Sequence, residues 1–459
     1  MSVLALSACE SPTPIIILTV DTLRADHLST YGYQRATDPN LREFAADAVV
    51  FTRAFTPRGK TTPAYASLLT GNYPARHGVR RLGDVLNDHN VTLAERLKDQ
   101  GYRTGAFVSS TVMVGRLSGL GQGFELWEDH MPSREKNRVN FERKADDVVE
   151  VATKWLNTVG PGTLFFLHLI DPHGPYLPPP PFGGHFRASA GREPRWVVPK
   201  FQRLDGATTL DDYVAAYDNE IRYADQALGR VLGKLKQRDL FDRALIVVTA
   251  DHGEAFGEDG LYLRHGEFLH DAVVRVPLLI RPPGGRSRAT SGRWDGAVSL
   301  TDIAATVMDY IGLPGIDEVD GVSLRSILQG AGGDQQRVVF SENFHSSPQR
   351  FAAHHRDGSL RLEGRCTVPH AKRSACSVRT RGTAETLTPE LGRHLGSSLE
   401  DWIERELAEP VPFATTRSYE PGDADFIERF IDTHNRDLAG GSELTPDDVE
   451  GLRSLGYVE

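Results

Sequence analysis

The sequence predicts an α/β protein with a large three-layer α/β/α domain, a mostly parallel central sheet and a smaller C-terminal α+β subdomain. Short apolar, β-branched runs alternate with segments of helical periodicity, which is typical of parallel strands joined by crossover helices. The chain has 459 residues, too many for one small core, and its apolar runs become sparse after residue 335. We therefore expect a short leader and tether over 1–13, a main domain over 14–335 and a smaller domain over 336–459.

Four runs are predicted to be strands of the central sheet, and each is followed by a polar side chain. The runs are 15–20 before Asp21, 105–108 before Ser109, 164–170 before Asp171, and 245–249 shortly before Asp251. In an open α/β sheet, ligands bind beyond the carboxyl ends of the parallel strands. We therefore expect the three aspartates to converge beside His252, as a metal site requires.

Two helices have clear sequence signals. Thr92 is expected to be an N-cap, with Glu95 at the capping-box position. Residues 211–237 carry an apolar stripe at helical spacing, which we interpret as core. A proline-rich segment over 177–182 and a Gly/Arg-rich stretch up to Trp196 predict a long surface loop at the rim of a site.

Composition excludes several classes of protein. The formal net charge is −10, which argues against a nucleic-acid partner. An acidic chain can still bind an anionic substrate when a bound cation dominates the local field. No apolar run is long enough to span a bilayer.

The cysteines favour an envelope compartment. Leu6-Ser7-Ala8-Cys9 resembles a bacterial lipobox followed by a Ser/Pro/Thr tether, which predicts a lipid anchor through Cys9 in the bacterial envelope or periplasm. The alternative is a chance match, because only eight residues precede Cys9 and no basic region is among them. Cys366 and Cys376 are spaced to close a short disulfide loop or to stay free thiols.

Five short segments follow one another along the chain, and together they indicate a protein family more strongly than any one of them alone. They are Thr19–His27; Thr61–Gly71 with Tyr73-Pro74 and His77-Gly78; Asp171–Tyr176; Asp251–Glu254 with Arg275–Leu278; and Asp320–Leu324, before a closing Leu455-Gly456-Tyr457. This series resembles the sulfatase family of the alkaline phosphatase superfamily, and the resemblance covers most of residues 14–330.

The resemblance implies a metal-dependent active site. Asp21, Asp251 and His252 would bind one divalent ion (Ca, Mg, Mn or Zn) through oxygen and imidazole ligands. Thr61 stands at the nucleophile position, in contact with the metal, and begins a run with helical character. The N-terminus of that helix would attract the anionic substrate. Alternatively, Thr61 is a plain capping residue.

Three further side chains have implied roles. His173 would donate to the ester oxygens or protonate the leaving group, and His265 and Lys60 would stabilise negative charge. The alternatives are a histidine bonded within its own loop and a surface lysine.

The chain departs from the family at positions that matter for its chemistry. Thr61 replaces the Cys or Ser that sulfatases oxidise to formylglycine, and Tyr65 replaces the arginine of the same motif. Thr22 replaces the second of two adjacent aspartates, while Ser109 and Thr111 replace a Lys-x-His pair. Because a secondary alcohol cannot yield that aldehyde, no formylglycine is expected.

We therefore predict a hydrolase of sulfate or phosphate esters that uses Thr61 directly, with phosphate at least as well suited as sulfate. The spacing of Asp171 and His173 differs from the Asp-x-x-x-His pair of two-zinc relatives, so one metal is expected. The alternatives are a catalytically impaired relative that binds an anionic glycan or lipid headgroup, and an envelope phosphotransferase.

Overall fold

The computed structural model describes residues 11–131, 133–134, 141–188, 198–287, 292–315, 318–343, 349–366, 376–381 and 388–408. Three features singled out above lie outside these ranges: Cys9, the loop around Trp196, and the closing Leu455-Gly456-Tyr457.

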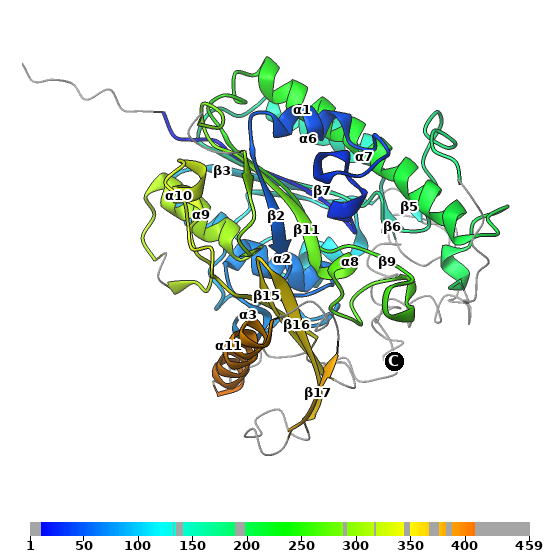
Figure 1. Ribbon diagram of the computed structural model, residues 1–459. Coiled ribbons are helices and arrows are strands. Elements are labelled where there is room, and N and C mark those ends of the chain that lie inside the picture. The colour runs from blue at the N-terminus through cyan, green and yellow to red at the C-terminus, as the bar shows by residue number, and fades with distance from the viewer. Residues whose placement is uncertain are drawn as a thin grey trace, which may run out of the picture.

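A nine-stranded sheet forms the centre of the molecule (Figure 1). Its order is β12-β2-β11-β8-β1-β7-β3-β4, and β13 also pairs with β2. The four strands predicted from sequence are β8, β1, β7 and β3, which are neighbours and parallel, so the prediction of a mostly parallel sheet is confirmed. Only β11 among the central strands runs antiparallel to its neighbours. The strands are β1 (Ile15–Val20), β2 (Val49–Phe55), β3 (Arg103–Phe107), β4 (Leu126–Glu128), β7 (Thr163–Leu169), β8 (Leu245–Ala250), β11 (Arg275–Arg281), β12 (Arg293–Trp294) and β13 (Val298–Ser299).

The central strands are apolar because helices cover both faces of the sheet. Every residue of β1, β7 and β8 is buried. Helices α1 (Pro39–Ala45), α6 (Ala145–Leu156) and α7 (Leu210–Gln237) lie on one face, and α2 (Thr61–Thr70) and α9 (Asp302–Ile311) lie on the other (Figure 1). The structure therefore has the three layers that the sequence predicts.

The helix ends follow their sequence signals. Thr92 caps α4 (Leu93–Asp99) in a full capping box with Glu95, as predicted. Thr209 does the same for α7 with Asp212, and α7 coincides with the predicted amphipathic stretch. No helix among the described residues is long and apolar enough to cross a membrane. The shorter helices are α3 (Pro74–His77), α5 (Gly115–Ser118), α8 (Asp271–Val274), α10 (Arg325–Leu328), η1 (Ala25–His27), η2 (Ser29–Tyr31), η3 (Thr111–Met113), η4 (Lys200–Gln202) and η5 (Glu258–Gly260).

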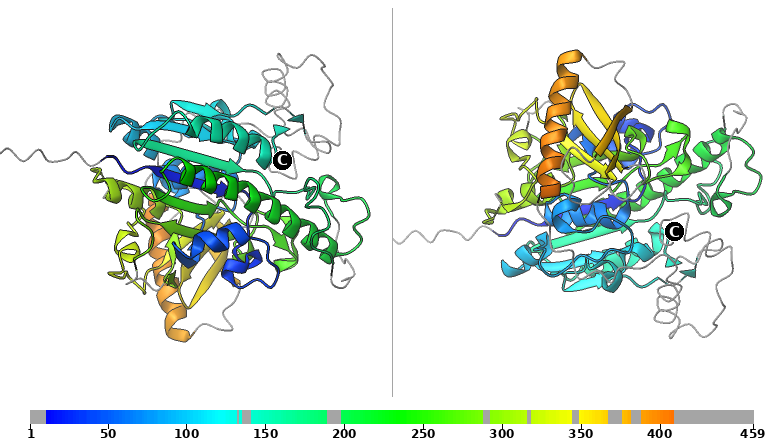
Figure 2. Two further views of the ribbon diagram at one scale, coloured as in Figure 1. Left: turned by 90° about the horizontal axis from the view of Figure 1, so that it is seen from above. Right: turned by 90° about the horizontal axis from the view of Figure 1, so that it is seen from below.

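A second, antiparallel sheet follows in the order β14-β15-β16-β17, with α11 (Pro389–Ala408) packed across it (Figure 2). Trp402 of α11 is buried against Tyr73, Phe340 and Phe351. The backbone of Cys366 pairs with that of Cys376 across two strands of this sheet. Its strands are β14 (Val339–Asn343), β15 (Gln349–His355), β16 (Gly358–Cys366) and β17 (Cys376–Arg381); two short hairpins pair β5 (Ser133–Arg134) with β6 (Phe141–Glu142) and β9 (Ala255–Phe256) with β10 (Tyr262–Arg264).

Candidate active site

Strand register brings two aspartates to the same point of the sheet edge. Val20 of β1 pairs with Ala250 of β8, and the next residue in each chain segment is an aspartate, Asp21 and Asp251. With His252 they form a cluster whose ligand atoms all lie within 4.8 Å of one another, and all three residues are buried. The structure thus brings together the three side chains that the sequence predicts to meet.

The oxygen and nitrogen atoms of this cluster are suited to bind a cation. Asp251 Oδ1 accepts hydrogen bonds from the backbone N–H groups of Thr22 (3.2 Å) and His252 (2.8 Å). Its Oδ2 is buried, lacks a hydrogen-bond donor among the described residues, and lies 3.2 Å from His252 Nε2. His252 Nδ1 donates to the Gly253 carbonyl (3.0 Å), which leaves the Nε2 lone pair facing the carboxylates. A divalent ion between these atoms would turn their mutual repulsion into coordination.

Thr61 is the first residue of α2 and lies against this cluster. Its Oγ1 is 3.3 Å from His252 Nε2 and 3.5 Å from Asp21 Oδ2. The N-cap residue, Lys60, makes no side-chain hydrogen bond to the helix. The start of the 10-residue helix therefore presents backbone N–H groups and the positive end of its dipole beside the Thr61 hydroxyl.

Two further histidines extend the cluster. The ring of His265 stacks on that of His252 with centroids 4.3 Å apart, and the ring of His173 meets His265 edge-on at 5.3 Å. His265 Nδ1 lies 3.3 Å from Oε1 of Glu254, a fully buried residue whose other oxygen accepts from the Tyr176 hydroxyl. Burial raises the pKa of Glu254 to about 8. The ring of His265 thus contacts both His173 and His252.

Lys60 borders the same region. Its side chain lies over the backbone of Gly266, where an added Cβ would come within 2.1 Å of the Lys60 Cε. Burial, reinforced by the nearby Arg58 guanidinium, lowers the pKa of Lys60 to about 8. The half-buried lysine therefore packs against the segment that carries His265 rather than extending into solvent.

Asp171 does not join the metal cluster, so the expectation of three converging aspartates is wrong. Val20 pairs with Leu169, which sets Ile170 at the level of Asp21 and puts Asp171 one residue further, on the opposite face of the sheet. There its carboxylate accepts from Lys144 Nζ (2.9 Å) and from the N–H of Ala145 (2.8 Å), at the start of α6.

Sequence reasoning gave no role to His168, although the structure places it beside the cluster. His168 Nε2 lies 3.3 Å from Asp21 Oδ2, and the side chain is fully buried. Burial lowers the pKa of His168 to about 4, so the imidazole is neutral at pH 7. One signal was available: His168 is the single strongly polar residue in the buried run from Leu164 to Leu169. Glu254 was also overlooked, although it belongs to the same short motif as Asp251.

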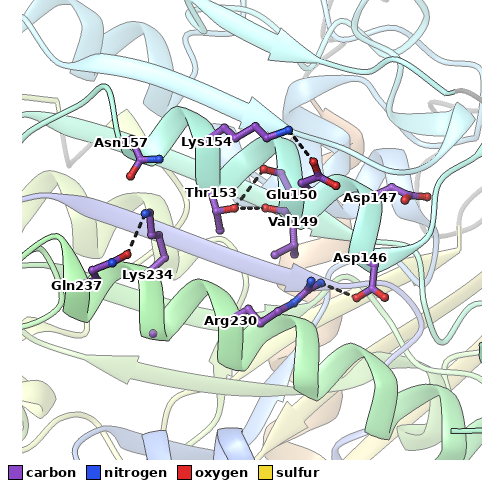
Figure 3. A pocket seen from close by; sticks show the side chains of 11 residues that line it. Asp146, Asp147, Val149, Glu150, Thr153, Lys154, Asn157, Arg230, Lys234 and Gln237 are labelled. Atoms are coloured by element: carbon purple, nitrogen blue, oxygen red, sulfur yellow. Dashed lines mark hydrogen bonds and ion pairs between the residues drawn. The ribbon is translucent and has the colours of Figure 1, made fainter. Parts of the chain in front are cut away.

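A groove of about 630 Å³ between α6 and α7 lies apart from the candidate active site (Figure 3). None of the candidate catalytic or metal-binding residues lines it. Its charged groups largely pair with one another: Lys154 with Glu150 and Arg230 with Asp146, while Lys234 bonds to Gln237 (Figure 3).

The chain is similar to known sulfatases and, in fold, to a phosphonate monoester hydrolase. An Ulvan-active sulfatase of Formosa agariphila is 23% identical over 349 residues, covering 72% of this chain and 68% of the relative. An arylsulfatase of Clostridium perfringens is 24% identical over 391 residues, covering 72% and 81%. The crystal structure of a phosphonate monoester hydrolase of Agrobacterium radiobacter superposes with a TM-score of 0.65 at 20% identity, covering 95% of this chain and 98% of that one, so the fold is shared. The sulfatase family model matches residues 13–313, and the chain therefore belongs to the sulfatase family.

Proposed function

We propose that the chain hydrolyses phosphate or sulfate esters with Thr61 as the nucleophile and one divalent metal ion held by Asp21, Asp251 and His252. Its family membership makes it a hydrolase of sulfuric or phosphoric esters. The observation that carries the finer proposal is the position of Thr61 Oγ1, which lies 3.3 Å from His252 Nε2 at the N-terminus of a buried helix. We place its action in the bacterial cell envelope, on an anionic ester.

The bound ion would polarise the ester's anionic oxygens and favour the ionised form of the nucleophile. Thr61 Oγ1 loses its proton to solvent and attacks phosphorus or sulfur, and the bond from that atom to the ester oxygen breaks. His173 or His265 gives that leaving oxygen a proton, while Lys60 and the N–H groups of α2 bind the charge on the transferred group. Water then attacks the phospho- or sulfo-threonine, which releases the inorganic anion and restores the hydroxyl.

Phosphate suits this site because hydrolysis of a threonine ester requires attack at the central atom. A formylglycine hydrate avoids that step by breaking a C–O bond, and Thr61 offers no such route. Tyr65 is fully buried behind the site, at the position where the family has an arginine. The loss of that cation supports the second candidate, a binding protein for an anionic glycan or lipid headgroup.

Replacing Thr61 distinguishes an ester hydrolase that uses this nucleophile from a protein that only binds an anionic ligand. The purified chain would be given Mg²⁺, Ca²⁺, Mn²⁺ or Zn²⁺ and assayed with aryl sulfate, aryl phosphate, aryl phosphonate and bis-aryl phosphate esters. We expect Thr61→Ala to lower kcat by about 10³-fold or more, because the attacking oxygen is lost. Thr62→Ala is the matched control, since the neighbouring hydroxyl donates to the Val112 carbonyl instead.

Unchanged turnover by Thr61→Ala would rule out this nucleophile. If the unaltered chain binds metal but turns over none of the four esters, the binding function is the better account.

A further inference from the structure

A group of three buried side chains lies beside Asp21, and His168 at its centre contacts Asp21 Oδ2. It consists of His168 in β7, Ser109 directly after the Val108 that follows β3, and Tyr65 in α2, and all three residues are buried. None of them belongs to the ligand cluster. Tyr65 and Ser109 stand at two of the positions where this chain departs from the sulfatase pattern, and both contact His168.

Strand register explains why His168 reaches Asp21. Thr19 of β1 pairs with His168 of β7, so their side chains lie on the same face of the sheet. Asp21 lies two residues after Thr19 and therefore projects from that face as well. The resulting distance between His168 Nε2 and Asp21 Oδ2 is 3.3 Å.

The hydrogen bonds fix which ring nitrogen of His168 carries the proton. The backbone N–H of Ser109 donates to His168 Nδ1 at 3.4 Å, so Nδ1 is an acceptor. The Ser109 hydroxyl donates to the His168 carbonyl at 2.7 Å and holds the two segments together. Tyr65 packs edge-on against the imidazole, with ring centroids 5.3 Å apart. His168 therefore keeps its proton on Nε2 and donates it to Asp21.

We propose that His168 is a positioning residue for the metal ion: it holds Asp21 Oδ2 through the Nε2–H, so that Oδ1 is directed toward His252. Asp21 Oδ1 lies 3.9 Å from His252 Nε2. Hydrogen bonds from outer residues orient metal ligands and set metal affinity. This inference rests on the proposed metal site and assigns Ser109 and Tyr65 to the support of His168.

The test compares two substitutions of His168, whose side-chain amide nitrogens stand in for different nitrogens of the imidazole ring. The amide nitrogen of glutamine can occupy the place of Nε2 and donate to Asp21, whereas that of asparagine reaches only the place of Nδ1. Binding of Mg²⁺, Ca²⁺, Mn²⁺ and Zn²⁺ to the metal-free chain would be measured by calorimetry. We expect His168→Asn to weaken binding of the tightest ion by about 10–100-fold and His168→Gln to recover most of that loss.

His354→Asn is the control for damage to the core. His354 is also fully buried and hydrogen-bonded, but it lies in β15 of the second sheet and its partners are Ser341 and Ser359. It should bind the ion as the unaltered chain does.

Each of the remaining outcomes would contradict either the role of His168 or the metal site on which it rests. If the unaltered chain binds an ion and His168→Asn binds it equally well, His168 does not position Asp21, although the metal site stands. Equal losses in His168→Asn and His168→Gln, or a similar loss in His354→Asn, would also overturn the inference. If no ion binds the unaltered chain, the proposed metal site itself fails.

Discussion

At the scale of single residues, Asp171 and Asp251 follow the two strands that flank β1, and they differ in the hydrogen-bond donors and cations around them. Asp251 is fully buried, and its Oδ2 has no hydrogen-bond donor among the residues that the structure describes. Asp171 is equally buried but accepts from Lys144 and from the first N–H of α6. A buried carboxylate with such partners is stable by itself, whereas one without them needs a cation.

Asp171→Asn should therefore weaken folding without affecting the metal site. The substitution removes the charge that pairs with Lys144, whose side chain is 42% exposed, so we expect the free energy of unfolding to fall by about 1–3 kcal/mol. Urea unfolding measures this loss, and calorimetry should show unchanged metal affinity. Asp251→Asn is the counterpart and should abolish binding. Comparable losses of metal affinity in both variants would show that Asp171 acts on the ion after all.

At the scale of elements, α2 is held rigidly on all sides. All ten of its residues are buried. The following short helix, α3, is tied to it by His77, whose Nε2 lies 2.9 Å from Ser67 Oγ. Because the N–H of Val79 donates to His77 Nδ1 at 3.1 Å, the proton of this imidazole lies on Nε2 and is donated to Ser67. The link requires a neutral histidine.

This link predicts acid sensitivity. Burial lowers the pKa of His77 from 6.5 to about 3, so below pH 6.5 the unfolded chain binds a proton that the folded chain does not. The contribution of His77 to stability is therefore complete above pH 6.5 and falls as the pH drops toward 3, by up to about 1.4 kcal/mol per pH unit.

Urea unfolding between pH 7 and pH 4.5 should show a smaller loss of stability in His77→Gln than in the unaltered chain. The other buried histidines titrate in both proteins, so the difference isolates His77. Parallel curves for the two proteins would mean that His77 is already charged in the folded state.

At the scale of the whole molecule, the site joins elements that are distant in the sequence. Asp21 directly follows β1, Thr61 begins α2, and Asp251 and His252 directly follow β8. An ion bound here would connect these elements and add to the stability of the folded chain only.

Metal removal should therefore lower the stability of the entire protein. At an ion concentration of about 100 times Kd, binding adds about 2.7 kcal/mol to the free energy of unfolding. Thermal unfolding with the ion and with a chelator would measure the difference. Asp251→Asn should unfold at the same temperature in both conditions; a chelator effect that persists in this variant would place the ion elsewhere.

The local pattern of residues was sufficient to predict the strands, the capping box at Thr92 and the long helix α7, because each depends on periodicity or on side chains a few positions apart. It also predicted that Asp21, Asp251 and His252 lie together, because polar residues after buried parallel strands meet at one sheet edge. Their binding of a metal ion stays a prediction. The division of the chain at residue 335, the disulfide and the lipid anchor stay predictions.

Only the tertiary structure decided which polar residues face the cluster. His168 lies within a strand that the sequence marks as core, and Asp171 follows that same strand in a motif typical of an active site. The register between β1 and β7 puts His168 on the face of Asp21 and turns Asp171 to the other face. Side chains alternate along a strand, so a shift of one residue reverses their direction, and that register is fixed by packing between segments far apart in the chain.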